Sequence, residues 1–200
     1  MTKPQRAERG VLAHPVFLRV MSCTTDPASG KRVRVLIVAY GNPLRSDDGL
    51  AWHVADALEG KFPPPEVEIL RLHQLAPELA ERVSRADAVI FVDAASADAG
   101  KRQPGDIRIE EIHVEQPDSS VQSRFSHHLT PAVVVAMAAQ LYGASARAFS
   151  ATLTGVNFEH GESLSGPVHD SLPEFVTRIE GLALQLQSPP DAFPARSTKP

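Results

Sequence analysis

Residues 33–39 read VRVLIVA, a nearly continuous run of aliphatic and β-branched side chains. Such a run is typical of a strand that is buried on both faces of a parallel sheet. The following stretch, GLAWHVADALE at 49–59, has apolar side chains at helical spacing, at Leu50, Val54 and Leu58. A buried strand that leads directly into an amphipathic helix is the first half of a β-α-β unit, so this stretch predicts an α/β protein.

The same alternation continues along the chain. Strands are predicted at EVEILRL (66–72) and AVIFVDA (88–94), with a helix over PELAERVSRA (77–86) between them. The remaining predicted elements are an alternating, half-exposed edge strand at 106–115, a helix at 131–143, a strand at 149–156 and a final helix at 167–187. Thr130 and Pro131 have the residue types of an N-cap and a first helical position, and Gly143 is a helix stop.

These elements predict a single three-layer α/β domain. Its mostly parallel, twisted sheet has about five strands, one antiparallel edge strand, and helices on both faces, as in phosphorylase/hydrolase-like folds. We assign the domain to residues 31–187. Residues 1–30 are expected to form an extension outside the core, with Met1 or Met21 as the start of translation, and residues 188–200 a proline-rich tail.

Composition excludes several classes of protein. The formal net charge of −4 leaves no basic surplus to neutralise phosphates, which argues against a nucleic-acid binder. The single cysteine, Cys23, cannot form an internal disulfide or a thiolate zinc cage, so we expect a reducing cytoplasm. No apolar run approaches the roughly 20 residues that span a bilayer, so no membrane insertion is expected.

Acidic and imidazole side chains gather at the predicted strand ends. In open α/β sheets, ligands bind beyond the carboxyl ends of the strands. The residues that follow these ends, or precede the helix at 131–143, include Asp47, Asp48, His73, Asp93, His127 and His128. Three or four separate loops therefore bring carboxylates and imidazoles to one rim of the sheet.

Each of these residues also has an ordinary structural interpretation. Asp47 or Asp48 could cap the helix that starts at Gly49, where unpaired N–H groups favour an anion. One cap needs only one carboxylate, so we expect one of the two to cap and the other to point into the rim. His73 could be a surface histidine at a strand end, and Asp93 could hydrogen-bond its own loop.

The residue types at the rim favour metal chemistry. Carboxylate and imidazole without thiolate suit zinc, nickel or cobalt. Three protein ligands would leave coordination positions open for water or for another molecule. A seryl nucleophile is less attractive, because there is no G-x-S-x-G elbow and Ser46 has no evident partner base. A phosphate cradle is also disfavoured, since the loop lacks G-x-G-x-x-G and a Walker lysine.

Several of these motifs resemble one known family. The strand, loop and helix VLIVAYGNPLRSDDGLAWHV (35–54) resemble the opening signature of the [NiFe]-hydrogenase maturation endopeptidases, roughly G-x-G-N-x-L-x-x-D-(D/E)-G-x-G after a strand. Further similar motifs follow in the same order: HQLAPELAE (73–81), IFVDA (90–94), SHHLTP (126–131) and GVNFEHGESLSGPV (155–168). The resemblance covers residues 33–185.

The resemblance implies a function. It implies a cytoplasmic hydrolase, a protease of aspartic endopeptidase type, that removes a C-terminal peptide from the large-subunit precursor of a [NiFe] hydrogenase and so activates that enzyme. Cleavage follows nickel insertion, and the nickel in the precursor is the recognition signal. The matching positions imply that Asp48, His73 and His128 contact this nickel. Asp48 and Asp93 are the residues to which we assign catalysis, Asp93 in an acid/base role or in support of the ligands.

The sequence departs from the family pattern at three positions. His73 stands where the family often has an aspartate, which keeps a donor for nickel but removes a negative charge. Ala39 and Ala51 replace two glycines of the signature. Two other functions stay open: a nickel- or zinc-binding assembly chaperone that cleaves nothing, and a nucleotide- or nucleoside-handling enzyme of similar topology.

Overall fold

The computed structural model describes residues 33–97, 102–114 and 129–187. The expected N-terminal extension, the expected tail and two rim histidines, His127 and His128, lie outside the described residues. The elements in chain order are β1 (Val33–Tyr40), η1 (Ser46–Gly49), α1 (Leu50–Leu58), β2 (Val67–Leu72), α2 (Leu79–Ser84), β3 (Ala86–Ser96), β4 (Ile107–Ile112), α3 (Pro131–Tyr142), β5 (Arg147–Gly155) and α4 (Gly166–Gln187).

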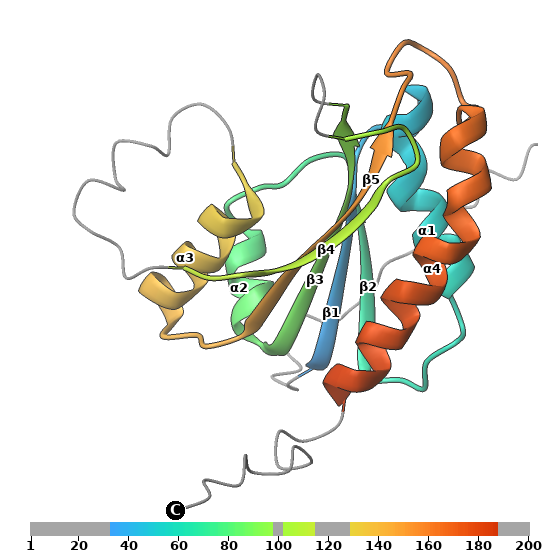
Figure 1. Cartoon of the computed structure of the whole chain (residues 1–200). Helices are drawn as coiled ribbons and strands as arrows, with labels where there is room; N and C mark the ends of the chain where they lie inside the picture. The colour runs from blue at the N-terminus through green and yellow to red at the C-terminus, as the bar shows by residue number, and fades with distance from the viewer. Residues whose placement is uncertain (1–32, 98–101, 115–128, 188–200) are drawn as a thin grey trace, which may run out of the picture. The chain divides into compact units, whose positions relative to one another are not determined.

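The strands form one five-stranded sheet in the order β2-β1-β3-β5-β4 (Figure 1). β2, β1, β3 and β5 run parallel, and β4 pairs antiparallel with β5 at the edge. The predicted fold class is therefore confirmed, including the antiparallel edge strand. β2 pairs with one edge of β1, and the chain then crosses over so that β3 pairs with the other edge. The strand order therefore reverses between β1 and β3, and sheets of this kind bind ligands at such a topological switch point.

Two apolar cores lie on opposite faces of the sheet. Val35 and Ile37 of β1 pack into one core with α1 and α4. Leu36 and Val38 alternate with them and pack into the other core with α2 and α3. All four side chains are almost completely buried. Burial on both faces explains why β1 reads as a continuous aliphatic run rather than an alternating one.

The observed helix termini match some of the termini predicted from the sequence. α3 begins at Pro131 with the Thr130 hydroxyl accepting from the Val133 amide at 3.4 Å, and it ends at Tyr142, followed by the predicted stop Gly143 with a left-handed φ of 66°. The expected start of α2 at Pro77 is wrong, because α2 begins at Leu79. Pro173 lies in the interior of α4. No helix among the described residues is long and apolar enough to cross a membrane.

Candidate functional site

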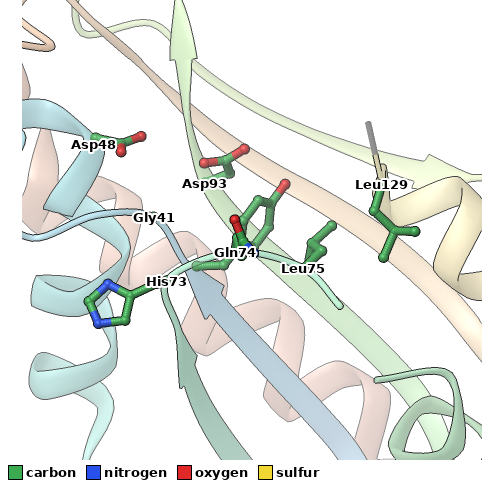
Figure 2. Close-up of a pocket in the computed structure, with 8 residues that line it drawn as sticks. Gly41, Asp48, His73, Gln74, Leu75, Asp93 and Leu129 are labelled. Atoms are coloured by element: carbon green, nitrogen blue, oxygen red, sulfur yellow. The ribbon is translucent and has the colours of Figure 1, made fainter. Parts of the chain in front are cut away.

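A pocket of about 420 Å³ lies at the carboxyl ends of β1, β2 and β3. The pairing of β1 with β3 ends at Ala39 and Val92, one residue before Asp93. β1 continues to pair with β2 through Tyr40, so the two central strands separate at this point. The residues that line the pocket are Tyr40, Gly41, Asp48, His73, Gln74, Leu75, Asp93 and Leu129 (Figure 2).

The turn after β1 places Asp48 at the pocket. Gly41 has a φ of 139°, and a Cβ atom there would lie 2.0 Å from the backbone oxygen of Asp48. Only glycine allows this close approach. The Asn42 amide then donates to Asp48 Oδ2 at 3.0 Å. The Asp48 carboxylate is therefore held by the turn while it faces the pocket.

Asp47 has a different environment from its neighbour. Its side chain is fully buried, and its carboxylate accepts four hydrogen bonds: from the amides of Val156, Asn157 and Ser165 and from the Ser165 hydroxyl. Burial alone raises the pKa of Asp47, but these donors outweigh it and hold the pKa below its usual value.

The expected cap on the first helix is therefore wrong. α1 begins after Gly49 without a side-chain cap, and η1 has none either. The physical reason is that the short 3-10 turn of η1 carries Asp47 inward, toward the unpaired amides of the loop that follows β5. That loop is about 110 residues away in the sequence, so the partner could not be recognised from local pattern.

Asp93 and Tyr40 form a half-buried pair in the pocket wall. Burial raises the pKa of Asp93 to about 6; hydrogen bonds from the Tyr40 hydroxyl and the Ala94 amide oppose this rise, and the charge of Asp48 adds to it. Burial, the charge of Asp93 and the hydrogen bond to it likewise raise the pKa of Tyr40 far above its usual value. Tyr40 therefore stays a neutral donor, and Asp93 can exchange a proton near neutral pH.

His73 lies at the exposed edge of the pocket, beside Trp52 of α1. The two ring centroids are 5.2 Å apart, with a tilt of 44° between the rings. The Trp52 indole N–H donates to the Gly41 carbonyl at 2.9 Å, which ties α1 to the turn after β1. Figure 2 shows the imidazole on the opposite side of the Gly41 turn from Asp93.

The pocket thus brings together three of the four predicted site residues. The carboxyl groups of Asp48 and Asp93 point toward one another across it, and His73 is at its edge (Figure 2). His128 lies outside the described residues. Within the described parts of the chain, no three His, Cys, Asp or Glu side chains are grouped to hold a metal ion. The assignment of metal-binding and catalytic roles stays a prediction.

Sequence reasoning missed two polar residues of the pocket, Tyr40 and Gln74. Both have a signal in the sequence, since Tyr40 directly follows the predicted strand at 33–39 and Gln74 comes two residues after the predicted strand at 66–72. The rule that ligands bind at carboxyl ends of strands covers both residues. Neither residue has the carboxylate or imidazole group by which the predicted rim is recognised.

Comparison with solved structures identifies the fold. The chain is similar to the hydrogenase maturating endopeptidase HybD from E. coli, with 20% identity and a TM-score of 0.57 over 76% of this chain and 93% of that one. It is also similar to the [NiFe] hydrogenase maturation protease HycI from Thermococcus kodakarensis KOD1, with 21% identity and a TM-score of 0.57 over 80% of this chain and 96% of that one.

The chain has the fold of the hydrogenase maturation proteases. HybD from Thermococcus kodakarensis gives the same result, with 21% identity and a TM-score of 0.54 over 75% of this chain and 99% of that one. No protein-family model matches the sequence, and no curated protein does either. The resemblance stated from sequence motifs is thus confirmed in the fold.

Proposed function

We propose that the protein is an endopeptidase that removes a C-terminal peptide from the large-subunit precursor of a [NiFe] hydrogenase. One observation carries the proposal: the carboxyl groups of Asp48 and Asp93 face each other at the strand ends of a chain with the maturation-protease fold. Facing carboxyl groups in a pocket can exchange protons with a water molecule and an amide nitrogen, which is the chemistry that peptide hydrolysis needs.

The nickel in this proposal arrives with the precursor and is part of the substrate. Asp48 and His73 supply an oxygen and a nitrogen donor, which suit nickel, and His128 is the proposed third ligand. The precursor's own ligands share the ion. A precursor without nickel lacks these shared bonds, so binding depends on whether the metal has been inserted.

Asp93 is the proposed acid/base. With a pKa of about 6, it is mostly ionised at neutral pH and can accept a proton from an attacking water molecule. The water oxygen bonds to the peptide carbonyl carbon, the C–N bond breaks, and Asp93 returns the proton to the departing amine. Tyr40 holds the Asp93 carboxyl group in place during both transfers.

A processing assay tests the function. The candidate large-subunit precursor is incubated with the protein, either loaded with nickel or left empty, and the products are weighed by intact-mass spectrometry. We expect a C-terminal peptide to be lost from the loaded precursor alone. The lone Cys23 favours the cytoplasm as the compartment, so the assay is run under reducing conditions.

Two other outcomes would change the conclusion. Cleavage of both precursors would support the protease function but would show that nickel is not the recognition signal. Nickel-dependent binding of the precursor without any change in its mass would replace the protease by the assembly chaperone. A verified cognate precursor that is neither bound nor cleaved would remove both functions.

A further inference from the structure

The loop after β1 and the loop after β5 are joined by backbone hydrogen bonds. The Ser46 amide donates to the Gly161 carbonyl at 2.7 Å, and the Gly161 amide donates to the Leu44 carbonyl at 2.9 Å. The Asp47 amide donates to the Asn157 carbonyl at 3.0 Å. The first loop carries Asp48 at the pocket, whereas no residue of the second loop lines the pocket.

The Asp47 carboxylate lies at the centre of this junction. Oδ2 accepts three of its four hydrogen bonds and Oδ1 accepts the fourth, so both oxygens are satisfied by the second loop. The junction is closely packed, because a Cβ atom on Gly155 would lie 2.9 Å from the Asp47 Cβ atom and 2.9 Å from the Phe158 ring. The second loop thus fits around Asp47 with little space left.

Ser46 shows that the junction constrains the first loop. It has a φ of 49°, a left-handed conformation that costs a non-glycine residue about 1–2 kcal/mol. Its hydroxyl donates to the Glu159 carbonyl at 3.2 Å and accepts from the Asn157 side chain at 3.3 Å. Contacts with the second loop therefore hold the first loop in a conformation that its own sequence does not favour.

Asp48 is connected to this junction through the 3-10 turn of η1. Its amide donates to the Arg45 carbonyl at 3.1 Å, and the Arg45 guanidinium donates to the Phe158 carbonyl at 3.1 Å. Its carboxylate is held from the other side by the Asn42 amide. The turn that carries Asp48 is thus fastened on one side by Asn42 and on the other by the second loop.

We propose that Asp47 is a positioning residue: by binding the loop of residues 155–165, it fixes the turn that aims the Asp48 carboxylate into the pocket. The two adjacent carboxylates then have separate roles, one inside the protein and one at its rim. The consequence for activity rests on the function proposed above, while the effect on Asp48 geometry does not.

The experiment compares two serine substitutions in the full chain. Ser165→Ala removes the hydroxyl donor to Asp47 and keeps the Ser165 amide bond. Ser84→Ala is the matched control, because it also removes a hydroxyl hydrogen bond, to the Glu81 carbonyl at 2.7 Å in α2, and Ser84 is not among the residues that line the pocket. The Asn42 amide resonance in a ¹H–¹⁵N NMR spectrum reports directly on the Asp48 carboxylate to which it donates.

We expect Ser165→Ala to shift the Asn42 resonance and to lower kcat for the nickel-loaded precursor roughly fivefold or more, with KM little changed. Ser84→Ala should change neither quantity. An Asn42 resonance and a kcat that both stay at the wild-type values in folded Ser165→Ala would overturn the proposal. If the wild-type protein cleaves no precursor, the proposed function fails, and the Asn42 resonance alone decides the positioning role.

Asp47→Asn provides a second variant. The side-chain amide of asparagine presents an N–H donor where one carboxylate oxygen accepted, so a donor of the second loop loses its partner. We expect a larger shift of the Asn42 resonance than in Ser165→Ala. A variant that is folded and has the wild-type Asn42 resonance would also contradict the proposal.

Discussion

At the scale of single residues, neighbouring carboxylates have opposite environments. Asp47 is fully buried, accepts four hydrogen bonds and has a lowered pKa, whereas Asp93 is half-buried with fewer donors and has a pKa of about 6. Asp48 is half-buried at the pocket, where its carboxylate accepts one backbone hydrogen bond, from the Asn42 amide. The position of each carboxylate relative to backbone amides, rather than its place in the sequence, determines its chemistry.

Asp48→Ala should abolish cleavage of the precursor and leave the fold intact. The side chain is only partly buried and accepts one backbone hydrogen bond, so its loss costs little stability. Asp56→Ala is the matched control, because it removes an exposed carboxylate of α1 that pairs with Arg71. Intact-mass assays and thermal unfolding of both variants check the prediction. An active Asp48→Ala protein would show that Asp48 is not needed for cleavage.

Tyr40→Phe should move the titration of Asp93 to higher pH. The Tyr40 hydroxyl stabilises the ionised form of Asp93, so its removal raises the pKa of that group above about 6. The ¹³C resonance of the Asp93 carboxyl carbon, followed by NMR against pH, measures the change. A titration that stays at its wild-type pH would mean that Tyr40 does not donate to Asp93.

Residue by residue, the sequence predicts the location of the site better than its internal contacts. Asp48, His73 and Asp93 were found because strand ends can be recognised from hydrophobic runs. The role of Asp47 and the pairing of Tyr40 with Asp93 were not found. Both depend on partners brought together only by the folded sheet, and no local spacing encodes them.

At the scale of elements, the turn after β1 requires a glycine at position 41. Gly41 and Gly60 both have a positive φ, but only Gly41 is crowded: an added Cβ atom would be 2.0 Å from the Asp48 carbonyl oxygen, whereas nothing lies within 4 Å of Gly60. The crowded carbonyl belongs to the residue that faces the pocket. Stability and site geometry are therefore linked at this one turn.

Gly41→Ala should destabilise the protein by about 3 kcal/mol or more, and Gly60→Ala by about 1 kcal/mol. Both variants bear the strain of a positive φ, of 139° at Gly41 and 76° at Gly60, and only Gly41→Ala adds the steric contact with the Asp48 backbone. Chemical denaturation provides the free energies of unfolding. Equal losses in the two variants would contradict the close approach at Gly41.

Elements with strong periodicity were predicted well. β1 appears where the aliphatic run indicated, and α3 has its expected proline, threonine cap and glycine stop. The 3-10 turn of η1 and the late start of α2 were not predicted. Short turns have no periodicity to recognise, and their boundaries are set by tertiary hydrogen bonds.

At the scale of the whole molecule, Asp47 and Asp93 make stability depend on pH in opposite directions. Asp47 has a lowered pKa in the folded state, so its stabilisation is present above the usual value and is lost as the pH falls. Asp93 has a raised pKa, so its favourable contribution is present at low pH and is lost as the pH rises from about 4 to about 6.

Asp93→Asn should therefore stabilise the protein at pH 8 while abolishing cleavage. The difference between the usual value of 3.8 and a pKa of about 6 corresponds to at most roughly 3 kcal/mol of destabilisation by the charged group. An uncharged amide removes this cost, and the gain should vanish near pH 4. Urea denaturation at both pH values tests this, and a gain of equal size at pH 4 would contradict it.

Trp52 is the only tryptophan of the chain, and its ring lies beside that of His73 at the edge of the pocket. Indole fluorescence depends on the immediate surroundings of the ring. The tryptophan fluorescence of the protein therefore comes from one site, next to the proposed nickel contact His73. Binding in the pocket can be followed through this fluorescence in the unlabelled protein. A fluorescence change on binding that disappears in His73→Ala would show that the change depends on the His73 imidazole.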